Sequence, residues 1–353
     1  MWADGPSPQS AVALSHPGGM MPRDTHRQRR TRAPVTNTNF DLYAEDWAPS
    51  YEPPASFELD GTEAVEPAES ATFQAIAPPH ADPIALAFVD GTRRVEIGLW
   101  QINRDTGETV RGIAGAYAVG AVVTGTGQPA RIVGERIGRV CVWGGGRTGD
   151  LGPRNGYHWR SVSIASHDPV DPLNALQDLM RQAEAALAEE LAAAGWLVVL
   201  DGPLNRIRSI SSMMAGYAKT HQRQLLPDDQ HVRIPTLTVG QRCPIWALGS
   251  DRYTCYARVG TPGPVGSPWG GIIRLEFPAT FGFDAAVAAA DQLTDRLPMY
   301  AGVPHRDPRA PQNLTPVRNL EQALARRIGT AKLSARTARD AVAAQQRLTG
   351  ASA

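Results

Sequence analysis

The stretch WLVVLDGPL, residues 196–204, places five apolar residues directly before Asp201. Gly202 and Pro203 then end the apolar run. A continuous apolar run bounded by turn formers is typical of a strand that is buried on both faces of a sheet. A carboxylate at the C-terminal end of such a strand costs free energy unless something compensates for its charge. We therefore expect Asp201 to have a compensating partner.

A second copy of this pattern lies upstream in IALAFVDGT, residues 84–92. Here too we expect an apolar strand to end in Asp-Gly, at Asp90 and Gly91. Two buried strands that each carry an aspartate to their ends predict two carboxylates that meet at one point. The usual compensation for such a pair is a divalent metal ion.

Residues 171–194 give the clearest helix signal in the chain. Asp171 and Pro172 suit the N-cap and the first helical position, and Gly195 suits the C-terminal stop. Glu184 lies roughly 50° from the centre of the apolar face at about 100° per residue. A helix glutamate is usually a solvated flank, but the two strand-end aspartates favour Glu184 as a third carboxylate of the same site. The apolar face is formed by Leu173, Leu176, Met180, Leu187, Leu191 and Ala194.

The order of these elements predicts the fold class. A strand ending at Asp90 is followed by an antiparallel meander through residues 93–102 and 110–124, then by the helix with Glu184 and the strand with Asp201. This is the order of an α/β protein with an RNase H-like core: three antiparallel strands, a helix, and a strand beside the first, in a mixed sheet flanked by helices. The converging carboxylates of such a core can hold Mg²⁺ or Mn²⁺ with oxygen ligands.

Composition sets limits on the class of protein. Lys and Arg number 35, as do Asp and Glu, so no global basic field indicates nucleic-acid binding, although a local patch would suffice. The three cysteines form no CxxC pair, which indicates reduced thiols. The sequence has no apolar run of about eighteen residues and no signal-peptide pattern, so we expect a cytoplasmic protein without membrane contact.

The composition also divides the chain into three parts. Residues 1–80 are rich in Pro, Ser and Ala and are expected to be a disordered tail, with a short docking motif as the alternative. Residues 81–330 hold the predicted core. Residues 331–353 are expected to form a C-terminal basic helix.

Residues 205–223 carry local positive charge that the net charge hides. Arg206, Arg208 and Arg223 are candidates for contacts with a nucleic-acid backbone, and Lys219 is a candidate for neutralising a phosphate. The alternative is a solvated helix face without a ligand.

Several of these segments resemble the NurA nuclease domain. The similarity covers roughly residues 83–305, and LDGPL at 200–204 is its most specific part. It implies an RNase H-like fold, Mn²⁺ or Mg²⁺ as cofactor, and hydrolysis of DNA phosphodiester bonds. It also implies a homodimer that acts with a HerA-type hexameric DNA-pumping ATPase, in DNA end processing or in defence against phage. The other matching segments are FVDGT at 88–92, Tyr217-Ala-Lys219, Tyr300 and His305.

The resemblance also assigns roles to individual residues. The family's two strand aspartates correspond to Asp90 and Asp201, its helix glutamate to Glu184 and its late histidine to His305. All four would be metal ligands; Glu184 could instead orient the attacking water, and His305 is alternatively a general acid. From the residues alone, His305 can almost equally be a loop histidine without a task. The remaining catalytic candidates are Lys219 and Tyr300. The long N-terminal part and residues 125–168 depart from the family pattern.

Two other functions compete with a metal-dependent DNA nuclease. The first is a non-catalytic RNase H-like module that binds DNA or a motor protein, which the retained carboxylates disfavour. The second is an unrelated α/β hydrolase or transferase. The sequence has no GxSxG elbow, and its GxGxxG match at residues 144–149 is followed by Leu-Gly-Pro, which disfavours the helix that a dinucleotide site needs.

Overall fold

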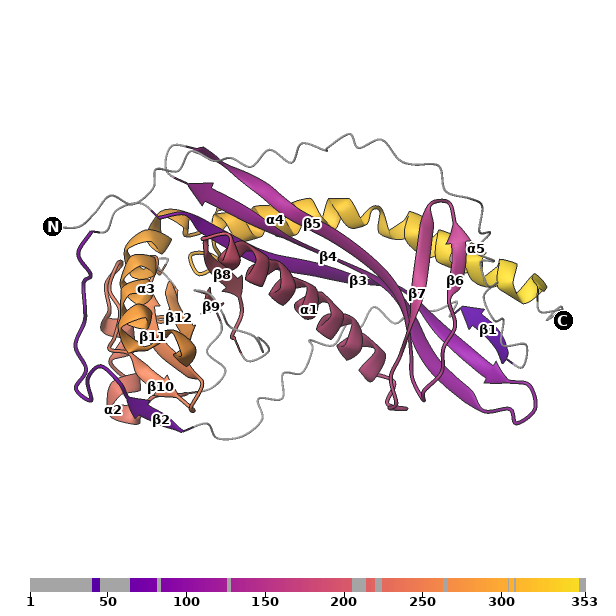
Figure 1. Cartoon of the computed structure of the whole chain (residues 1–353), viewed down its shortest axis with the longest axis horizontal. Coiled ribbons are helices and arrows are strands. Elements are labelled where there is room, and N and C mark those ends of the chain that lie inside the picture. Colours follow the sequence, from indigo (N-terminus) through magenta and orange to yellow (C-terminus); the bar gives the residue numbers. More distant parts are fainter. Residues whose placement is uncertain are drawn as a thin grey trace, which may run out of the picture. The chain divides into compact units, whose positions relative to one another are not determined.

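The fold is described from a computed structural model (Figure 1). Its elements are those of an α/β protein with one large mixed sheet and flanking helices. The structure describes residues 40–44, 64–80, 84–125, 128–204, 214–219, 224–262, 266–303, 305–307 and 309–348.

The centre of the sheet has the RNase H-like strand order. Strands β3 and β4 are antiparallel, and so are β4 and β5. After helix α1, strand β8 lies parallel to β3 on its other side, and β9 lies parallel to β8. Three antiparallel strands, a helix and a strand beside the first confirm the predicted fold class. The bounds are β3 (Leu86–Asn103), β4 (Thr109–Gly125), β5 (Gln128–Trp143), α1 (Asp171–Ala193), β8 (Leu197–Asp201) and β9 (Met214–Ala218).

The first strand differs from the prediction. Asp90 and Gly91 do not end it, because β3 continues through both residues to Asn103. The third antiparallel strand is therefore β5, which the sequence analysis placed in the insertion at 125–168. Gly91 serves close packing: a Cβ there would lie 2.9 Å from Met180 Cγ and 2.5 Å from Glu184 Oε1, both on α1. The Asp-Gly pair is a turn signal in the local sequence, but in the structure Gly91 lies inside a strand and leaves space for α1.

Further strands extend the sheet on both sides. Beyond β9 the sheet continues through the antiparallel strands β12, β11, β10 and β2. Beyond β5 it continues through β7, which is parallel to β5, and β6, which is antiparallel to β7. Strands β1 and β2 belong to the sheet although the sequence analysis placed their residues in the N-terminal tail; the rest of that predicted tail, 1–39 and 45–63, lies outside the described residues. The bounds are β12 (Ile272–Pro278), β11 (Arg252–Arg258), β10 (Trp246–Leu248), β2 (Val65–Pro67), β7 (Tyr157–Ser163), β6 (Leu151–Arg154) and β1 (Phe40–Ala44).

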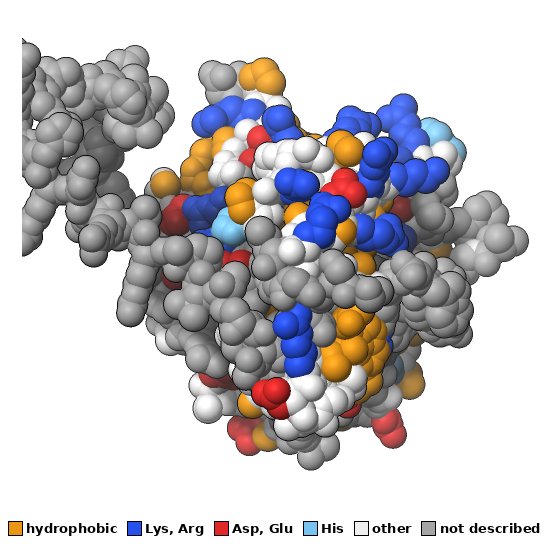
Figure 2. Space-filling view, turned by 90° about the vertical axis from the view of Figure 1, so that its right-hand side faces the viewer, with side chains coloured by type: hydrophobic (Ala, Val, Ile, Leu, Met, Phe, Trp, Pro, Cys, Tyr) orange, Lys and Arg blue, Asp and Glu red, His pale blue; other side chains and the backbone are white. Residues whose placement is uncertain are grey.

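Helices cover both faces of the central strands. Ala87 and Val89 of β3 pack with α1, whereas Phe88 packs in the core that α3 and α4 share. α5 contacts β1, β3 and β6 over a smaller core. Lys and Arg side chains gather on the face of the molecule shown in Figure 2. The bounds are α2 (Asp228–His231), α3 (Phe283–Arg296), α4 (Thr315–Ile328) and α5 (Ala331–Leu348), with 3₁₀ turns at Ile234–Thr236, Ala279–Phe281 and Leu297–Tyr300. Among the described helices, none is long and apolar enough to cross a bilayer.

Gly91→Ala tests the contact between β3 and α1. We expect it to lower the free energy of unfolding by about 1–3 kcal/mol, because the new methyl group overlaps Met180 and Glu184 in a packed interior. Urea denaturation followed by circular dichroism measures the change. Gly152→Ala is the matched control, since no atom lies within 4 Å of its Cβ position and its φ is not positive. Equal stability of the two variants would contradict the packing described here.

Candidate metal centre

Asp90 and Asp201 lie beside each other on one face of the sheet. β3 and β8 are parallel, and their last paired residues are Val89 and Leu200. The next residue on each strand is an aspartate. Because side chains alternate along a strand, Asp90 faces the same side as Phe88, which is the side covered by α4. The register of two parallel strands therefore brings the two carboxylates together.

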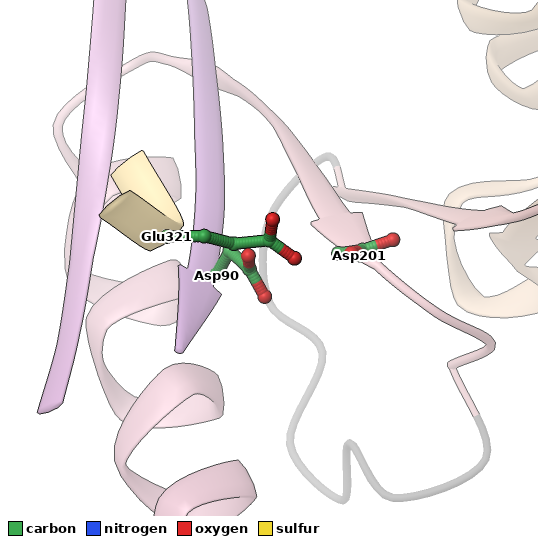
Figure 3. Close-up of side chains that lie close together, drawn as sticks. All are labelled: Asp90, Asp201 and Glu321. Carbon is green, nitrogen blue, oxygen red and sulfur yellow. The ribbon is translucent and has the colours of Figure 1, made fainter. Parts of the chain in front are cut away.

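Glu321 of α4 completes a group of three carboxylates. One oxygen of each of Asp90, Asp201 and Glu321 lies within 4.8 Å of the others, and the three could together hold a metal ion. Figure 3 shows Glu321 and Asp90 side by side, with Asp201 at the end of its strand. α4 approaches closely here, since a Cβ at Gly120, the β4 partner of Asp90, would lie 3.3 Å from Leu320 and Leu324.

Glu321 was not among the site residues predicted from the sequence. The buried residues Leu320 and Leu324 recur at helical spacing, and Glu321 lies directly beside that stripe. The reasoning that selected Glu184 on α1 would have selected Glu321 as well.

The environment of Asp90 is suited to a cation. Its side chain is 7% exposed, and within the described structure its Oδ2 atom is buried without a hydrogen-bond partner. Burial raises the pKa of Asp90 well above its usual value, and the carboxylates of Asp201, Glu184 and Glu321 raise it further. Asp90, Asp201 and Glu321 each offer one ligand oxygen, and Asp90 Oδ2 receives no hydrogen bond from the described residues. Such a group fits a hard divalent cation, which prefers oxygen ligands.

Glu184 reaches β3 from α1. It is 9% exposed, and burial raises its pKa to about 8, while nearby Arg181 acts in the opposite direction and Asp201 adds to the increase. α1 packs on the face of β3 opposite to α4, so Glu184 approaches Asp90 from the other side of the strand. It does not belong to the group of three. As a metal ligand, Glu184 stays a prediction.

Lys219 connects Asp201 to a buried amide. Its ammonium group donates hydrogen bonds to Asp201 Oδ2 at 2.5 Å and to Asn313 Oδ1 at 3.0 Å. Burial raises the pKa of Asp201, and the Lys219 charge offsets part of that increase. Asn313 is fully buried and donates in turn to Asp307 Oδ2 at 2.6 Å.

Arg309 holds the third carboxylate. Its guanidinium donates to both oxygens of Glu321, at 3.2 and 2.6 Å. Its backbone N–H donates to Asp307 Oδ1 at 2.8 Å. Asp307 and Asn313 therefore join Lys219, the cation on Asp201, to Arg309, the cation on Glu321.

The other predicted site residues lie elsewhere or were not described. The Tyr300 hydroxyl donates to Thr124 Oγ1 at 3.2 Å, and its ring packs edge-on against Phe88 at 5.0 Å. His305 is exposed in a turn and does not belong to the group of three. The loop at 144–149 opens no helix, as expected. Outside the described residues lie Arg206, Arg208 and Arg223.

Comparison with known proteins does not identify the chain. No protein-family model matches it, and no curated protein matches its sequence. What is established is a group of two aspartates and a glutamate in an α/β protein that could hold a metal ion, with Asp90 buried and Asp201 and Glu321 half-buried.

The raised pKa of Glu184 predicts a stability that depends on pH. A carboxyl group whose folded-state pKa is about 8 stabilises the fold most below its unfolded value, and this contribution is lost as pH rises through 8. In EDTA, we expect unfolding free energy to fall by on the order of 2 kcal/mol between pH 6 and pH 8.5, at about 1.4 kcal/mol per pH unit. Glu184→Gln should weaken this dependence, which denaturation at the two pH values would measure.

Glu189→Gln serves as the control for this experiment. Glu189 lies on the same helix but is only partly buried, so its replacement should leave the pH dependence unchanged. If Glu184→Gln and Glu189→Gln give the same profile as the wild type, Glu184 does not bind a proton more tightly in the folded state.

Arg309 is expected to orient Glu321 for metal binding. Outer partners of ligands typically contribute 10–100-fold to metal affinity, so Arg309→Gln should weaken Mn²⁺ binding by about that factor. If it acts through Glu321, it should have no further effect in the Glu321→Gln background. Titration calorimetry of the two single variants and the double variant measures this. Arg131→Gln, at an exposed position of β5, is the control; additive losses would show that Arg309 acts independently of Glu321.

Proposed function

We propose that this protein is a divalent-metal-dependent DNA nuclease that hydrolyses phosphodiester bonds. The observation that carries the proposal is the buried Asp90 carboxylate, whose Oδ2 atom has no hydrogen-bond partner among the described residues and which lies with Asp201 and Glu321 in one group. The NurA resemblance supports DNA as the substrate. The RNase H-like strand order agrees with the fold that this resemblance implies.

In this proposal, Asp90, Asp201 and Glu321 hold Mn²⁺ or Mg²⁺. Such an ion lowers the pKa of an attacking water and stabilises the leaving oxygen. Lys219 places a positive charge at the same edge of the site, where it can contact the scissile phosphate. Glu184, with a pKa near 8, is suited to accept or release a proton at neutral pH.

The proposal includes partners and a cellular role. We infer that the protein acts in the cytoplasm as a homodimer with a HerA-type hexameric ATPase, in DNA end processing or defence against phage. These inferences rest on the NurA resemblance alone. His305 and Tyr300 stay candidates for catalysis on the same basis.

A non-catalytic RNase H-like module that binds DNA or a motor protein is the alternative. A module that only binds has no need for buried carboxylates that repel one another. Asp90 retains its charge-bearing group at a cost in stability, which favours a site that binds a cation.

Cleavage of linear and circular DNA, single- and double-stranded, tests the function directly. We expect cutting with Mn²⁺ or Mg²⁺, none with EDTA, and a loss of at least about a thousandfold in Asp201→Asn and Glu321→Gln, because each removes a metal-ligand charge. Comparison with Glu184→Gln separates the two candidate glutamates. A greater loss of Mn²⁺ affinity in Glu321→Gln than in Glu184→Gln is the expected result.

Asp284→Asn is the matched control, because Asp284 is exposed on α3, outside the group of three. Full activity of Asp201→Asn would exclude the proposed site. Metal binding without cleavage of any DNA, also in the presence of a HerA-type ATPase, would favour the non-catalytic alternative.

A further inference from the structure

The C-terminal part of the chain is strongly basic although the whole protein is neutral. Residues 322–348 contain six Lys and Arg and one acid, Asp340, whereas the complete chain has 35 of each sign. Figure 2 shows Lys and Arg side chains gathered on the right-hand end of the molecule in Figure 1, where α5 ends beside β1, β6 and β7. Positive charge is therefore concentrated on one surface.

Four of these cations form a narrow stripe along α5. Lys332, Arg336, Arg339 and Arg347 are all exposed. At about 100° per residue they fall within an arc of about 80°. At about 1.5 Å per residue the stripe is about 22 Å long. The buried residues lie on the opposite side of the helix and are Ser334, Thr337, Ala338, Ala341 and Val342.

Within the described part of the chain, the cations of the stripe have no acidic partner. Among the described residues, no ion pair involves any of its four cations. A solvated helix face of this kind usually alternates charges of both signs. Four like charges along one line instead favour a ligand with repeated negative charge.

The chemistry of this surface favours nucleic acid over a protein or a membrane. Protein interfaces need buried aromatic or aliphatic anchors, and membrane-surface helices need an apolar face. On α5 the only exposed large apolar side chain among the described residues is Leu333, at the edge of the stripe. A phosphate backbone requires only cations, whose binding releases condensed counterions.

The helix that carries the stripe follows the helix that carries Glu321. α4 bears Glu321 and, five residues later, the exposed Arg326, and α5 begins after Gly329 and Thr330. Figure 1 shows the two helices one after the other along β3. We propose that the cationic stripe of α5 is a docking surface for the phosphate backbone of DNA, which positions a strand toward the carboxylates. This deepens the proposed nuclease function and rests on it.

Binding of fluorescently labelled 30-base-pair DNA in EDTA tests the proposal without catalysis. The variant Lys332→Gln/Arg336→Gln/Arg339→Gln/Arg347→Gln removes the stripe. We expect affinity at 100 mM salt to fall at least about tenfold, and the slope of log affinity against log salt to become shallower by about 3–4, at about 0.9 per phosphate contact. Fluorescence anisotropy over a salt series measures both.

A charge-preserving variant, Arg336→Lys/Arg339→Lys/Arg347→Lys, is the matched control. Because a phosphate responds to the charge, this variant should bind as the wild type does. An unchanged salt slope in the neutralised variant, or no binding by the wild type, would overturn the proposal. Cleavage assays separate the nuclease function from DNA docking on the stripe. If the wild type cuts DNA with metal and the neutralised variant binds DNA as the wild type does, only the docking proposal is refuted. Loss of binding in that variant without any cutting by the wild type supports the stripe and refutes the nuclease.

Discussion

The candidate site depends on the burial of one carboxylate, that of Asp90. Removing an ionised carboxylate from water costs far more than a neutral group does, unless it gains a counter-charge or hydrogen-bond donors. In the described structure Asp90 Oδ2 has no donor, and the nearest charged groups that raise its pKa are three other carboxylates. Such an arrangement opposes folding and persists only if the occupied site has a use. The affinity of the site for a cation therefore follows from the unfavourable burial of the Asp90 charge beside other carboxylates.

The central sheet explains how carboxylates from distant segments meet. In the RNase H-like order β8 lies parallel to β3, and the register places Asp201 beside Asp90. Each face of β3 then receives one helix at close range, α1 over Gly91 and α4 over Gly120 on the adjacent strand. The absence of a side chain at these two positions lets each helix bring a glutamate toward the same strand. The close packing of α1 and α4 on these glycines is consequently also what places Glu184 and Glu321 near Asp90.

The parts of this arrangement that depend on local pattern could be predicted from sequence. The apolar run before Asp201, the amphipathic helix with Glu184 and the order of the elements indicated the sheet correctly. The Asp90-Gly91 pair was interpreted as a strand end, because the contact that explains Gly91 is with α1, far away in sequence. Glu321 was missed although it lies beside the buried face of α4 at helical spacing; its helix follows no strand-end aspartate along the chain, and only the packing of α4 on β3 and β4 brings it to Asp90. Arg309 and Asn313 lie in an irregular segment whose pairing is set by tertiary contacts.

The distribution of cations around the site explains why no described cation bonds to Asp90 Oδ2, although the Lys219 charge lowers the pKa of Asp90 in part. Lys219 is fixed on Asp201, and Arg309 is fixed on Glu321. Lys219 also donates to the buried Asn313, which donates to Asp307, so Lys219 cannot move to Asp90 without breaking a hydrogen bond to a buried group. Arg309 is held by its two hydrogen bonds to Glu321. Three carboxylates thus face two held cations, and one negative charge remains at the most buried position. A proton or a divalent cation can neutralise it, and these compete for the same oxygens. Lys219 and Arg309 therefore bind the two outer carboxylates, and the central carboxylate of Asp90 is the one that a bound metal ion would neutralise.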